Sequence, residues 1–345
     1  MVCITKKSIS QEAIAREAGV ARTTVSLALR GGDGLSKETT DKIMAAADKL
    51  GYRPNKLVHG IRSGRTGLIG VMVPPHDTYW AQVLYGIHDE LIEADLSPLV
   101  LWPNHRRKKI SERDELQQVN RLIDWRVDGT ILWPQLANLY QDHIEEFVKR
   151  DLGVVTIDSF LPDQFGADAV LSDEIMGAEA VAAHLLEQGH RHIIHFAGPR
   201  SESWARERRQ SFEAALDPIS GLRLHSIELP KDHDSRPLIR GSLEAWPETT
   251  AVFAATDHIA EQVYDVARDL GLAIPNDLSV VGFGDVDFAS RLTPPLTTVK
   301  HQPYRMGRKA AAMLIERITS KKENLSPRTE RLPVELIERS SSIPI

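Results

Sequence analysis

From residue 9 to residue 51 the apolar positions recur at intervals of three or four, which is the spacing of helices with one buried side. Ser10 is a favourable N-cap, and Gly19 allows the left-handed turn that ends a first helix. The pattern predicts three short helices, at residues 11–18, 21–30 and 37–50. Their apolar residues are spaced to share one small core, made of Ile14, Ala18, Val25, Leu29, Ile43, Ala46, Ala47 and Leu50.

The pattern changes at Gly67, after which apolar runs of four to six residues alternate with amphipathic helical stretches. Strands that are apolar at every position and separated by helices are typical of doubly wound parallel sheets, and this length suits two such sheets better than one. The predicted strands are "LIGVMV", "LVLW", "GTILW", "VVTID", "AVLS", "HIIHFAG", "AVFAA" and "SVVGF". Helices are expected between them, for example at residues 83–94, 113–125, 175–187 and 259–270.

Charge is distributed unevenly along the chain. Residues 1–66 contain 12 Lys and Arg against 6 Asp and Glu, whereas the rest contains 30 against 42. A basic head on an acidic body suggests that the head binds a polyanion, although an ordinary solvated helical surface would give the same counts. A single cysteine fits a reducing compartment. No apolar run approaches the roughly 20 residues that span a bilayer and no signal peptide is evident, so we expect a cytoplasmic protein without a membrane partner.

Three short helices with a tight glycine turn between the first two are typical of a helix-turn-helix unit. In that unit the second helix enters the major groove of DNA with its first residues, and Arg22 and Thr23 offer the donors and acceptors that base reading needs. A three-helix bundle without DNA-binding activity would have the same pattern. Residues 54–62 predict about two further helical turns, which are stable only when something docks against them, and a plain linker is the alternative.

Several separate motifs resemble those of one family, the lac repressor (LacI/GalR) family of bacterial transcription regulators. They are "AIAREAGVARTTVSLAL", "LGYRPN", "SGRTGLIGVMVP", "RVDGTILWP", "HLLEQGHRHIIHFAGP" and "LSVVGFGDVDFASRLTPPLTTV". The resemblance is collinear over nearly the whole chain, and motifs at matching spacing make it specific. It implies an α/β fold in which a three-helix DNA-binding domain and a hinge helix precede a two-lobed, periplasmic-binding-protein-like domain with doubly wound parallel sheets.

The resemblance also implies the domain boundaries. We expect a helix-turn-helix domain at 1–53, a hinge helix or linker at 54–66, and an effector-binding and dimerisation domain at 67–345. Within the last domain, lobe 1 is expected at about 67–165 and 296–325, and lobe 2 at about 166–295 and 326–345.

In the family the second helix reads base edges through its first two side chains and one near its middle. The matching residues are Arg22, Thr23 and Leu27, with Ser26 on phosphate. Leu27 departs from the polar residue of many members, since leucine can cover a thymine methyl but cannot donate to guanine. In the hinge, Ile61 matches the residue that wedges into the minor groove. The expected DNA-contacting residues are Arg22, Thr23, Ser26, Leu27, Arg30, Asn55, Val58 and Ile61.

Polar and aromatic residues collect where predicted strands end or the next helix begins, which is where parallel α/β folds bind ligands. Aromatic faces stack on sugar or base rings, and Asp and Arg hydrogen-bond to hydroxyl groups. The resemblance implies that Tyr79, Trp80, Asp158 and Arg208 face an effector; the expected set adds Trp204, Thr256, Asp257 and Asp285. The family often has another polar residue where Thr256 stands and commonly has Asp where Gly284 stands, so the effector's identity stays open.

Other chemistry has little support. His190, His192 and His195 are close in sequence, but a strand places only the first two on one face and no Cys or carboxylate cluster accompanies them, so no metal is expected. The "GFG" at 282–284 lacks the third glycine of a dinucleotide motif, and neither a P-loop nor a nucleophile elbow is present. We expect no catalytic residues and no cofactor. The scattered tryptophans are expected to serve packing.

We therefore expect a homodimeric repressor whose affinity for a palindromic operator is controlled by a small molecule between the lobes, with a sugar as the first candidate. A nucleobase, a nucleoside or a protein corepressor is the alternative. The same fold also occurs in extracellular solute-binding proteins and could support an enzyme. The basic head and the missing signal peptide argue against the first, and the lack of acid–base, nucleophile and cofactor motifs argues against the second.

Overall fold

The computed structural model describes residues 9–29, 34–53, 65–74, 78–102, 112–134, 147, 150, 152–161, 166–230, 234–320 and 326–345. The chain divides into two compact units, Met1–Thr66 and Gly67–Ile345. None of the helices in the described ranges is long and apolar enough to cross a membrane.

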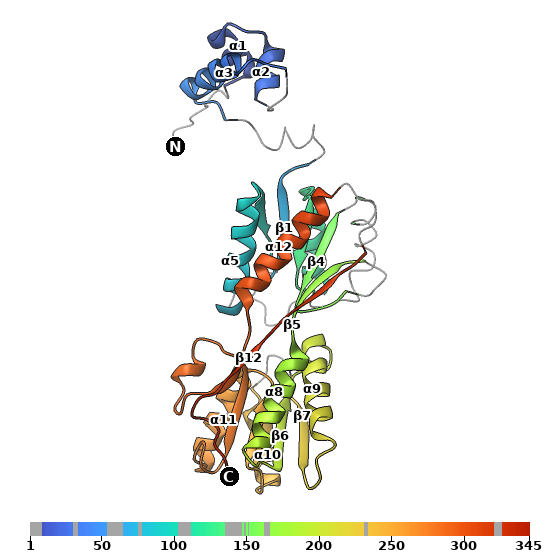
Figure 1. Ribbon diagram of the computed structural model, residues 1–345, viewed down its shortest axis with the longest axis vertical. Coiled ribbons are helices and arrows are strands. Elements are labelled where there is room, and N and C mark those ends of the chain that lie inside the picture. Colours follow the sequence, from blue (N-terminus) through green and yellow to red (C-terminus); the bar gives the residue numbers. More distant parts are fainter. Residues whose placement is uncertain are drawn as a thin grey trace. The chain divides into compact units, whose positions relative to one another are not determined.

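The described residues of the first unit form three helices around one small core (Figure 1). They are α1 (Gln11–Ala18), α2 (Arg22–Ala28) and α3 (Lys37–Leu50). The side chain of Ser10 caps α1, and Gly19 ends it at φ 63°, a left-handed conformation that glycine adopts without steric cost. Ile14, Val25 and Ile43 contribute one fully buried side chain from each helix. The predicted three-helix unit is confirmed, although α2 is shorter than predicted at both ends.

The second unit contains two six-stranded sheets, each at the centre of one lobe (Figure 1). The first sheet has the order β11-β5-β4-β3-β1-β2, with β1 (Leu68–Met72), β2 (Ser97–Val100), β3 (Gly129–Leu132), β4 (Gly153–Ile157), β5 (Asp168–Ser172) and β11 (Thr329–Leu332). The second has the order β12-β10-β9-β8-β6-β7, with β6 (His192–Ala197), β7 (Arg223–Glu228), β8 (Ala251–Ala254), β9 (Ser279–Gly284), β10 (Thr297–Lys300) and β12 (Glu335–Ile337). Only β10 and β12 pair antiparallel among these described strands, so the predicted doubly wound parallel sheets are confirmed.

Helices cover both faces of each sheet, which explains why β3, β4 and β8 are buried at every position. In the first lobe α5 (Thr78–Glu93) and α12 (Pro303–Thr319) pack together on one face, and α6 (Glu112–Asp124) covers the other. In the second lobe α10 (Arg236–Ala245) and α11 (Asp257–Leu270) share one core, and α8 (Glu174–Glu187) and α9 (Ser203–Leu216) share another. A short 3-10 helix, η3 (Ala289–Arg291), follows β9.

The chain crosses between the lobes three times, from β5 to α8, from β10 to α12 and from β11 to β12. The expected lobe boundaries differ from these crossings. Strand β5 belongs to the first sheet, although lobe 2 is expected to begin at 166, and β10 belongs to the second sheet, although lobe 1 is expected to resume at 296. Strand β11 joins the first sheet beside β5 rather than lobe 2. Sheet membership depends on which distant strand edge each segment pairs with, and local pattern does not encode that choice.

Four of the described strands are not predicted by the apolar runs in the sequence. Strands β7, β11 and β12 lie at sheet edges and are largely half-exposed, so their sequences mix polar and apolar residues. Strand β10 lies inside its sheet but reads "TTVK", and its two buried threonines carry polar groups.

Candidate ligand cleft and nucleic-acid interface

A cleft of about 460 Å³ lies between the two lobes of the second unit. Its walls come from the beginnings of α5, α8, α9 and α11 and from the segments that follow β3, β4, β9 and β10, which are the carboxyl ends of parallel strands. This volume lies within the usual range for small-molecule sites. The lining residues are Thr78, Tyr79, Trp80, Trp133, Asp158, Glu174, Trp204, Arg208, Thr256, Asp257, His258, Phe283, Gly284, Val286, Asp287, Phe288, Arg291 and His301.

Seven of the eight residues predicted to face an effector line this cleft, and Asp285 does not. The carboxylate of Asp285 accepts a hydrogen bond from Arg339 Nη2 at 2.6 Å, so it forms an ion pair with the C-terminal segment. Its neighbour Gly284, which has no side chain, lines the cleft in its place. The prediction for Asp285 is therefore corrected to a structural ion pair.

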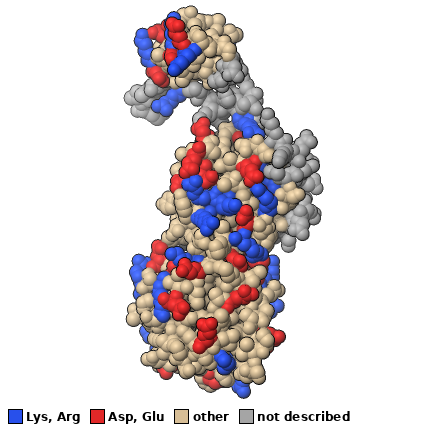
Figure 2. All heavy atoms as spheres, in the orientation of Figure 1, with Lys and Arg blue, Asp and Glu red and all other residues tan. Residues whose placement is uncertain are grey.

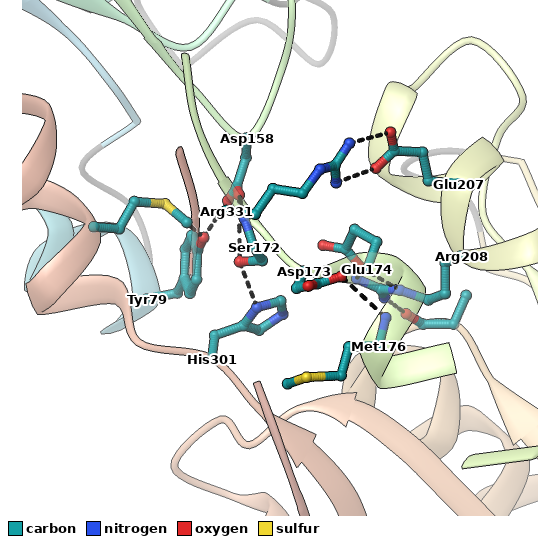
Figure 3. Close-up of polar contacts among 12 residues, drawn as sticks. Tyr79, Asp158, Ser172, Asp173, Glu174, Met176, Glu207, Arg208, His301 and Arg331 are labelled. Atoms are coloured by element: carbon teal, nitrogen blue, oxygen red, sulfur yellow. Dashed lines mark hydrogen bonds and ion pairs between the residues drawn. The ribbon is translucent and has the colours of Figure 1, made fainter. Parts of the chain in front are cut away.

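Tyr79 and Asp158 form a polar region on the first-lobe wall (Figure 3). The hydroxyl of Tyr79 donates to Asp158, and the backbone N–H of Ser172 donates to the other carboxylate oxygen at 3.3 Å. His301 Nδ1 lies 2.8 Å from Ser172 Oγ, which extends the network to a segment that crosses between the lobes. Burial raises the pKa of Asp158, and these hydrogen bonds oppose the shift. Burial also raises the pKa of Tyr79 and lowers the pKa of His301 to about 3, so both are neutral at pH 7.

Arg208 and Glu174 form a buried ion pair on the second-lobe wall (Figure 3). Arg208 Nε donates to Glu174 Oε2 at 2.8 Å, Nη2 donates to the same oxygen, and Nη1 donates to the carbonyl of Ala255. The guanidinium carbon lies 3.4 Å from the ring centre of Phe283 and 4.9 Å from that of Trp204. Burial raises the pKa of Glu174 to about 7, against the attraction of Arg208.

Thr256 and Asp257 line the second-lobe wall while holding its loops together. Thr256 caps α11 by accepting the N–H of Ile259 at 3.3 Å. Asp257 accepts the hydroxyl of Thr298 at 2.6 Å and the N–H of Val286 at 2.9 Å. Both carboxylate oxygens of Asp257 are thus already engaged, so its side chain fixes the loop after β9 as well as lining the cleft.

Aromatic rings cover parts of both walls. In the first lobe the ring centres of Trp80 and Trp133 are 5.0 Å apart, and Tyr79 meets Trp80 edge-on at 5.1 Å. Trp204 and Phe283 line the opposite wall. Trp133 packs against the first-lobe core, as expected for the scattered tryptophans, and it also lines the cleft.

Ten residues that line the cleft were not among the effector-contacting residues predicted from the sequence. Most of them follow the carboxyl ends of strands, and applying that positional rule to every strand would have found them. They are Thr78, Trp133, Glu174, His258, Phe283, Val286, Asp287, Phe288, Arg291 and His301.

Two of the polar contacts between described side chains join the lobes directly. Thr78 Oγ1 in α5 donates to Asp287 Oδ2 at 2.9 Å. Arg331 in β11 forms a two-pronged ion pair with Glu207 in α9, with N–O distances of 2.9 Å and 2.8 Å (Figure 3). Both contacts depend on the present arrangement of the lobes.

The histidines near β6 are not grouped with other potential metal ligands among the described residues. Across the part of the chain that the structure describes, no three His, Cys, Asp or Glu side chains are grouped as metal ligands would be. The His195 ring stacks on Phe253 at 4.7 Å, and burial lowers its pKa to about 3.

The predicted DNA-contacting residues of the first unit begin at the start of α2. Arg22 and Thr23 are exposed there, Ser26 and Leu27 are half-buried, and the first turn contains no acidic residue. Arg22 Nη1 lies 3.8 Å from Glu12, but both side chains are largely exposed and the pair is weak. The other predicted contacts, Arg30, Asn55, Val58 and Ile61, lie outside the described residues. On the visible face of the second unit, positive and negative side chains are interspersed, without one broad basic surface among the residues shown in colour (Figure 2).

Two family descriptions match the chain. Residues 12–55 match "Bacterial regulatory proteins, lacI family", and residues 182–342 match "Periplasmic binding protein-like domain". The first range covers the three-helix unit, and the second covers most of the second lobe together with α12 and β11 of the first lobe.

Characterised relatives align over nearly the full length. The HTH-type transcriptional repressor PurR of Photobacterium profundum is 26% identical, covering 95% of this chain and 97% of the relative. Catabolite control protein A of Priestia megaterium is 28% identical over 95% and 98% of the two chains. The ribose operon repressor of Escherichia coli (strain K12) is 29% identical over the same shares, 95% and 98%.

Solved structures share the fold. The lac repressor dimer bound to operator and the anti-inducer ONPF is 22% identical and superposes with a TM-score of 0.84 over 98% of this chain and 100% of that chain. The transcriptional regulator CelR in complex with cellobiose is 26% identical, with a TM-score of 0.69 over 96% and 99%. A LacI family regulator from Enterococcus faecium with bound ribose is 25% identical, with a TM-score of 0.68 over 81% and 99%. The chain thus combines a region that matches the lacI family of bacterial regulatory proteins with a periplasmic-binding-protein-like domain, and over nearly its full length it is similar to transcriptional repressors and regulators.

Proposed function

We propose that this protein is a transcriptional repressor whose affinity for operator DNA is set by a neutral carbohydrate in the cleft. The observation that carries the proposal is the composition of that cleft. Aromatic faces occupy both walls, and carboxylates with an ion-paired arginine lie between them. Aromatic faces suit the C–H faces of a sugar ring, and carboxylates accept hydrogen bonds from its hydroxyl groups. Related regulators that bind cellobiose and ribose support the same class of effector.

DNA binding is assigned to the first unit. Arg22 and Thr23 would read base edges, Leu27 would cover a thymine methyl, and Ser26 would contact phosphate. A palindromic operator is expected because two copies related by a twofold axis present two identical α2 helices. The structure of the lac repressor as a dimer on operator supports this arrangement. A cytoplasmic location and a regulatory rather than enzymatic role go with this proposal.

A nucleobase or nucleoside is the second candidate effector. Repressors named PurR are among the relatives, and the aromatic walls would stack on a planar base as well as on a sugar. The two candidates differ in their polar needs, since a base presents one or two ring edges whereas a sugar presents hydroxyl groups around its whole rim.

The test uses the full-length purified protein in two steps. Selection from a pool of randomised duplexes should recover a palindromic site, whose binding is then followed by fluorescence anisotropy. The selected duplex is titrated in the presence of glucose, ribose, cellobiose, hypoxanthine, guanine and adenosine. A change in operator affinity with a neutral sugar supports the proposal. A response to the bases alone would replace the carbohydrate by the second candidate, and failure to select any duplex would contradict the DNA-binding role.

A further inference from the structure

We propose that Glu174 makes the cleft selective for neutral effectors by occupying the anion site that Arg208 would otherwise offer. The proposal rests on the assignment of this cleft as the effector site. It predicts that phosphorylated and carboxylated ligands are rejected, and that a single side-chain amide substitution admits them.

The two features that attract anions in proteins meet at this position. Arg208 supplies a positive charge held against the faces of Phe283 and Trp204. The N-terminus of α8 supplies backbone N–H groups and a favourable dipole, and Glu174 is the first residue of that helix, directly after its cap Asp173. Such a combination binds phosphate or carboxylate groups readily. In this protein the anion at this position is the carboxylate of Glu174 itself.

The pair is too well buried for an incoming anion to share it. The side chains of Arg208 and Glu174 are 4% and 5% exposed. Two of the five guanidinium N–H donors go to Glu174 and one to the carbonyl of Ala255. The other two guanidinium N–H groups take no part in these contacts. They can donate to hydroxyl oxygens of a neutral effector, which need no counter-charge. An anion would have to displace Glu174 and leave its carboxylate buried without a partner, which is strongly unfavourable.

The surroundings of the pair strengthen this discrimination. Around Glu174, Asp158 and Glu207 add negative charge, and Arg331 is itself paired with Glu207. Two further lining residues, Tyr79 and His301, are neutral at pH 7. The lining also contains the carboxylates of Asp257 and Asp287, together with His258 and Arg291. An anion in the cleft would therefore meet net negative charge, and neutralising Glu174 would reduce that charge directly beside Arg208.

The test replaces Glu174 by glutamine, which keeps size and hydrogen-bonding capacity but removes the charge. The probe is sulfate, whose charge is constant above pH 4, compared with chloride at equal ionic strength by isothermal titration calorimetry at pH 8, where Glu174 is mostly ionised in wild type. Wild type should gain nothing from sulfate beyond the chloride control, whereas Glu174→Gln should bind it at least about tenfold more tightly. Glu179→Gln is the matched control, because Glu179 is an exposed residue of the same helix that does not line the cleft, and this substitution should leave sulfate binding as in wild type. An equal response of wild type and Glu174→Gln would overturn the proposal.

A second measurement needs no variant. Since burial raises the pKa of Glu174 to about 7, lowering the pH from 8 to 6 neutralises this carboxylate in an increasing fraction of wild-type molecules. Sulfate binding should strengthen over that range in wild type and stay flat over it in Glu174→Gln. The same slope in both proteins would show that another group governs anion binding.

A paired titration with glucose and glucose 6-phosphate separates this inference from the carbohydrate proposal. Gain of sulfate binding by Glu174→Gln without any response to neutral sugars would sustain the role of Glu174 and reject the carbohydrate. A response of wild type to glucose or another neutral sugar, together with no gain of anion binding in Glu174→Gln, would sustain the carbohydrate proposal and reject the role of Glu174. Tighter binding of glucose 6-phosphate than of glucose by wild type would also overturn the inference.

Discussion

The buried charged residues of the cleft each have a partner inside the protein. Asp158 is held by Tyr79 and Ser172, and Glu174 is held by Arg208. An unpaired buried charge costs several kcal/mol, so this pairing allows the cleft to exist without ligand. The hydroxyl groups of an effector would thus join a hydrogen-bond network that already exists. Binding would then depend on the shape and hydroxyl pattern of a neutral ligand.

Replacing Asp158 by asparagine should weaken effector binding about 10- to 100-fold. A hydrogen bond to a charged group contributes about 1.5–3 kcal/mol, and the amide cannot accept from Tyr79 and an effector hydroxyl with equal strength. Isothermal titration with the sugar that changes operator affinity measures the effect. Asp217→Asn, at an exposed position after α9, is the control and should bind as wild type. Unchanged affinity in Asp158→Asn would remove this residue from the effector site.

Glu174 should also make the stability of the second unit depend on pH. Its pKa is about 7 in the folded protein against an ordinary value of 4.5, so between these values the folded state binds more protons than the unfolded state. The contribution of Glu174 to the free energy of unfolding therefore falls as pH rises from about 4.5 to about 7, and it is level above that range. Denaturant unfolding at several pH values should show this slope in wild type and a reduced slope in Glu174→Gln.

Arg22 and Leu27 are expected to carry different parts of DNA specificity. Arg22→Ala should cost about 1–3 kcal/mol on the selected operator, with the loss concentrated at a guanine position. Leu27→Ala should instead relax the preference for thymine at a neighbouring position. Repeating the duplex selection with each variant measures both effects. Equal weakening on every sequence would show that these side chains contact only phosphate.

Among the elements, the contact of α5 with α12 is the most demanding. Gly86 in α5 faces Gly307 in α12, and a Cβ atom at either position would overlap a backbone carbonyl of the opposite helix, that of Tyr304 or Val83. Such close backbone approach is possible only without side chains at the crossing point. The two glycines are far apart in sequence, and they join the start of the first lobe to the helix that returns to it after the second.

Gly86→Ala should destabilise the first lobe by about 1–3 kcal/mol or more, because the added methyl group forces the helices apart. Gly241→Ala is the matched control, since this glycine lies inside α10 and a Cβ atom there would have nothing within 4 Å. At that position alanine should stabilise the helix by up to about 1 kcal/mol. The free energy of unfolding, measured with a chemical denaturant, should therefore fall in Gly86→Ala and rise in Gly241→Ala. A Gly86→Ala protein as stable as wild type would show that α5 and α12 can move apart at their crossing point without loss of stability.

In the second unit as a whole, the lobes are coupled by three chain crossings and by two described side-chain contacts, one within the cleft lining and one outside it. The bond of Thr78 to Asp287 and the ion pair of Arg331 with Glu207 form only when the lobes lie as they do in this structure. A ligand that favours this arrangement shifts the equilibrium between lobe positions, and DNA affinity follows if the first unit senses that equilibrium.

Arg331→Gln should weaken effector binding about two-fold by reducing the population of this lobe arrangement. The pair is partly exposed, so its contribution is only about 0.5 kcal/mol. A double-mutant cycle with Glu207→Gln isolates it, because the second substitution should add almost nothing once Arg331 is gone. Additive losses from the two substitutions would mean that the ion pair does not couple the lobes.

The sequence by itself determined the kind of fold and much of the site. Caps at Ser10 and Gly19, helical spacing of apolar residues and apolar strand runs are local signals, and each element follows from a few neighbouring residues. Seven cleft residues were predictable because the ends of parallel strands lie on one edge of the sheet and the family resemblance aligned them.

Only the tertiary structure decided how those elements combine. The lobe membership of β5, β10 and β11 depends on pairing between strands that are up to about half the chain apart. The partners of Asp285, Glu174 and Asp257 could not be read locally, because a carboxylate bonds to whichever donor the fold brings within about 3 Å. Local pattern encodes helices, strands and exposed ends, whereas charge pairing inside the cleft is a property of residues that meet only after folding.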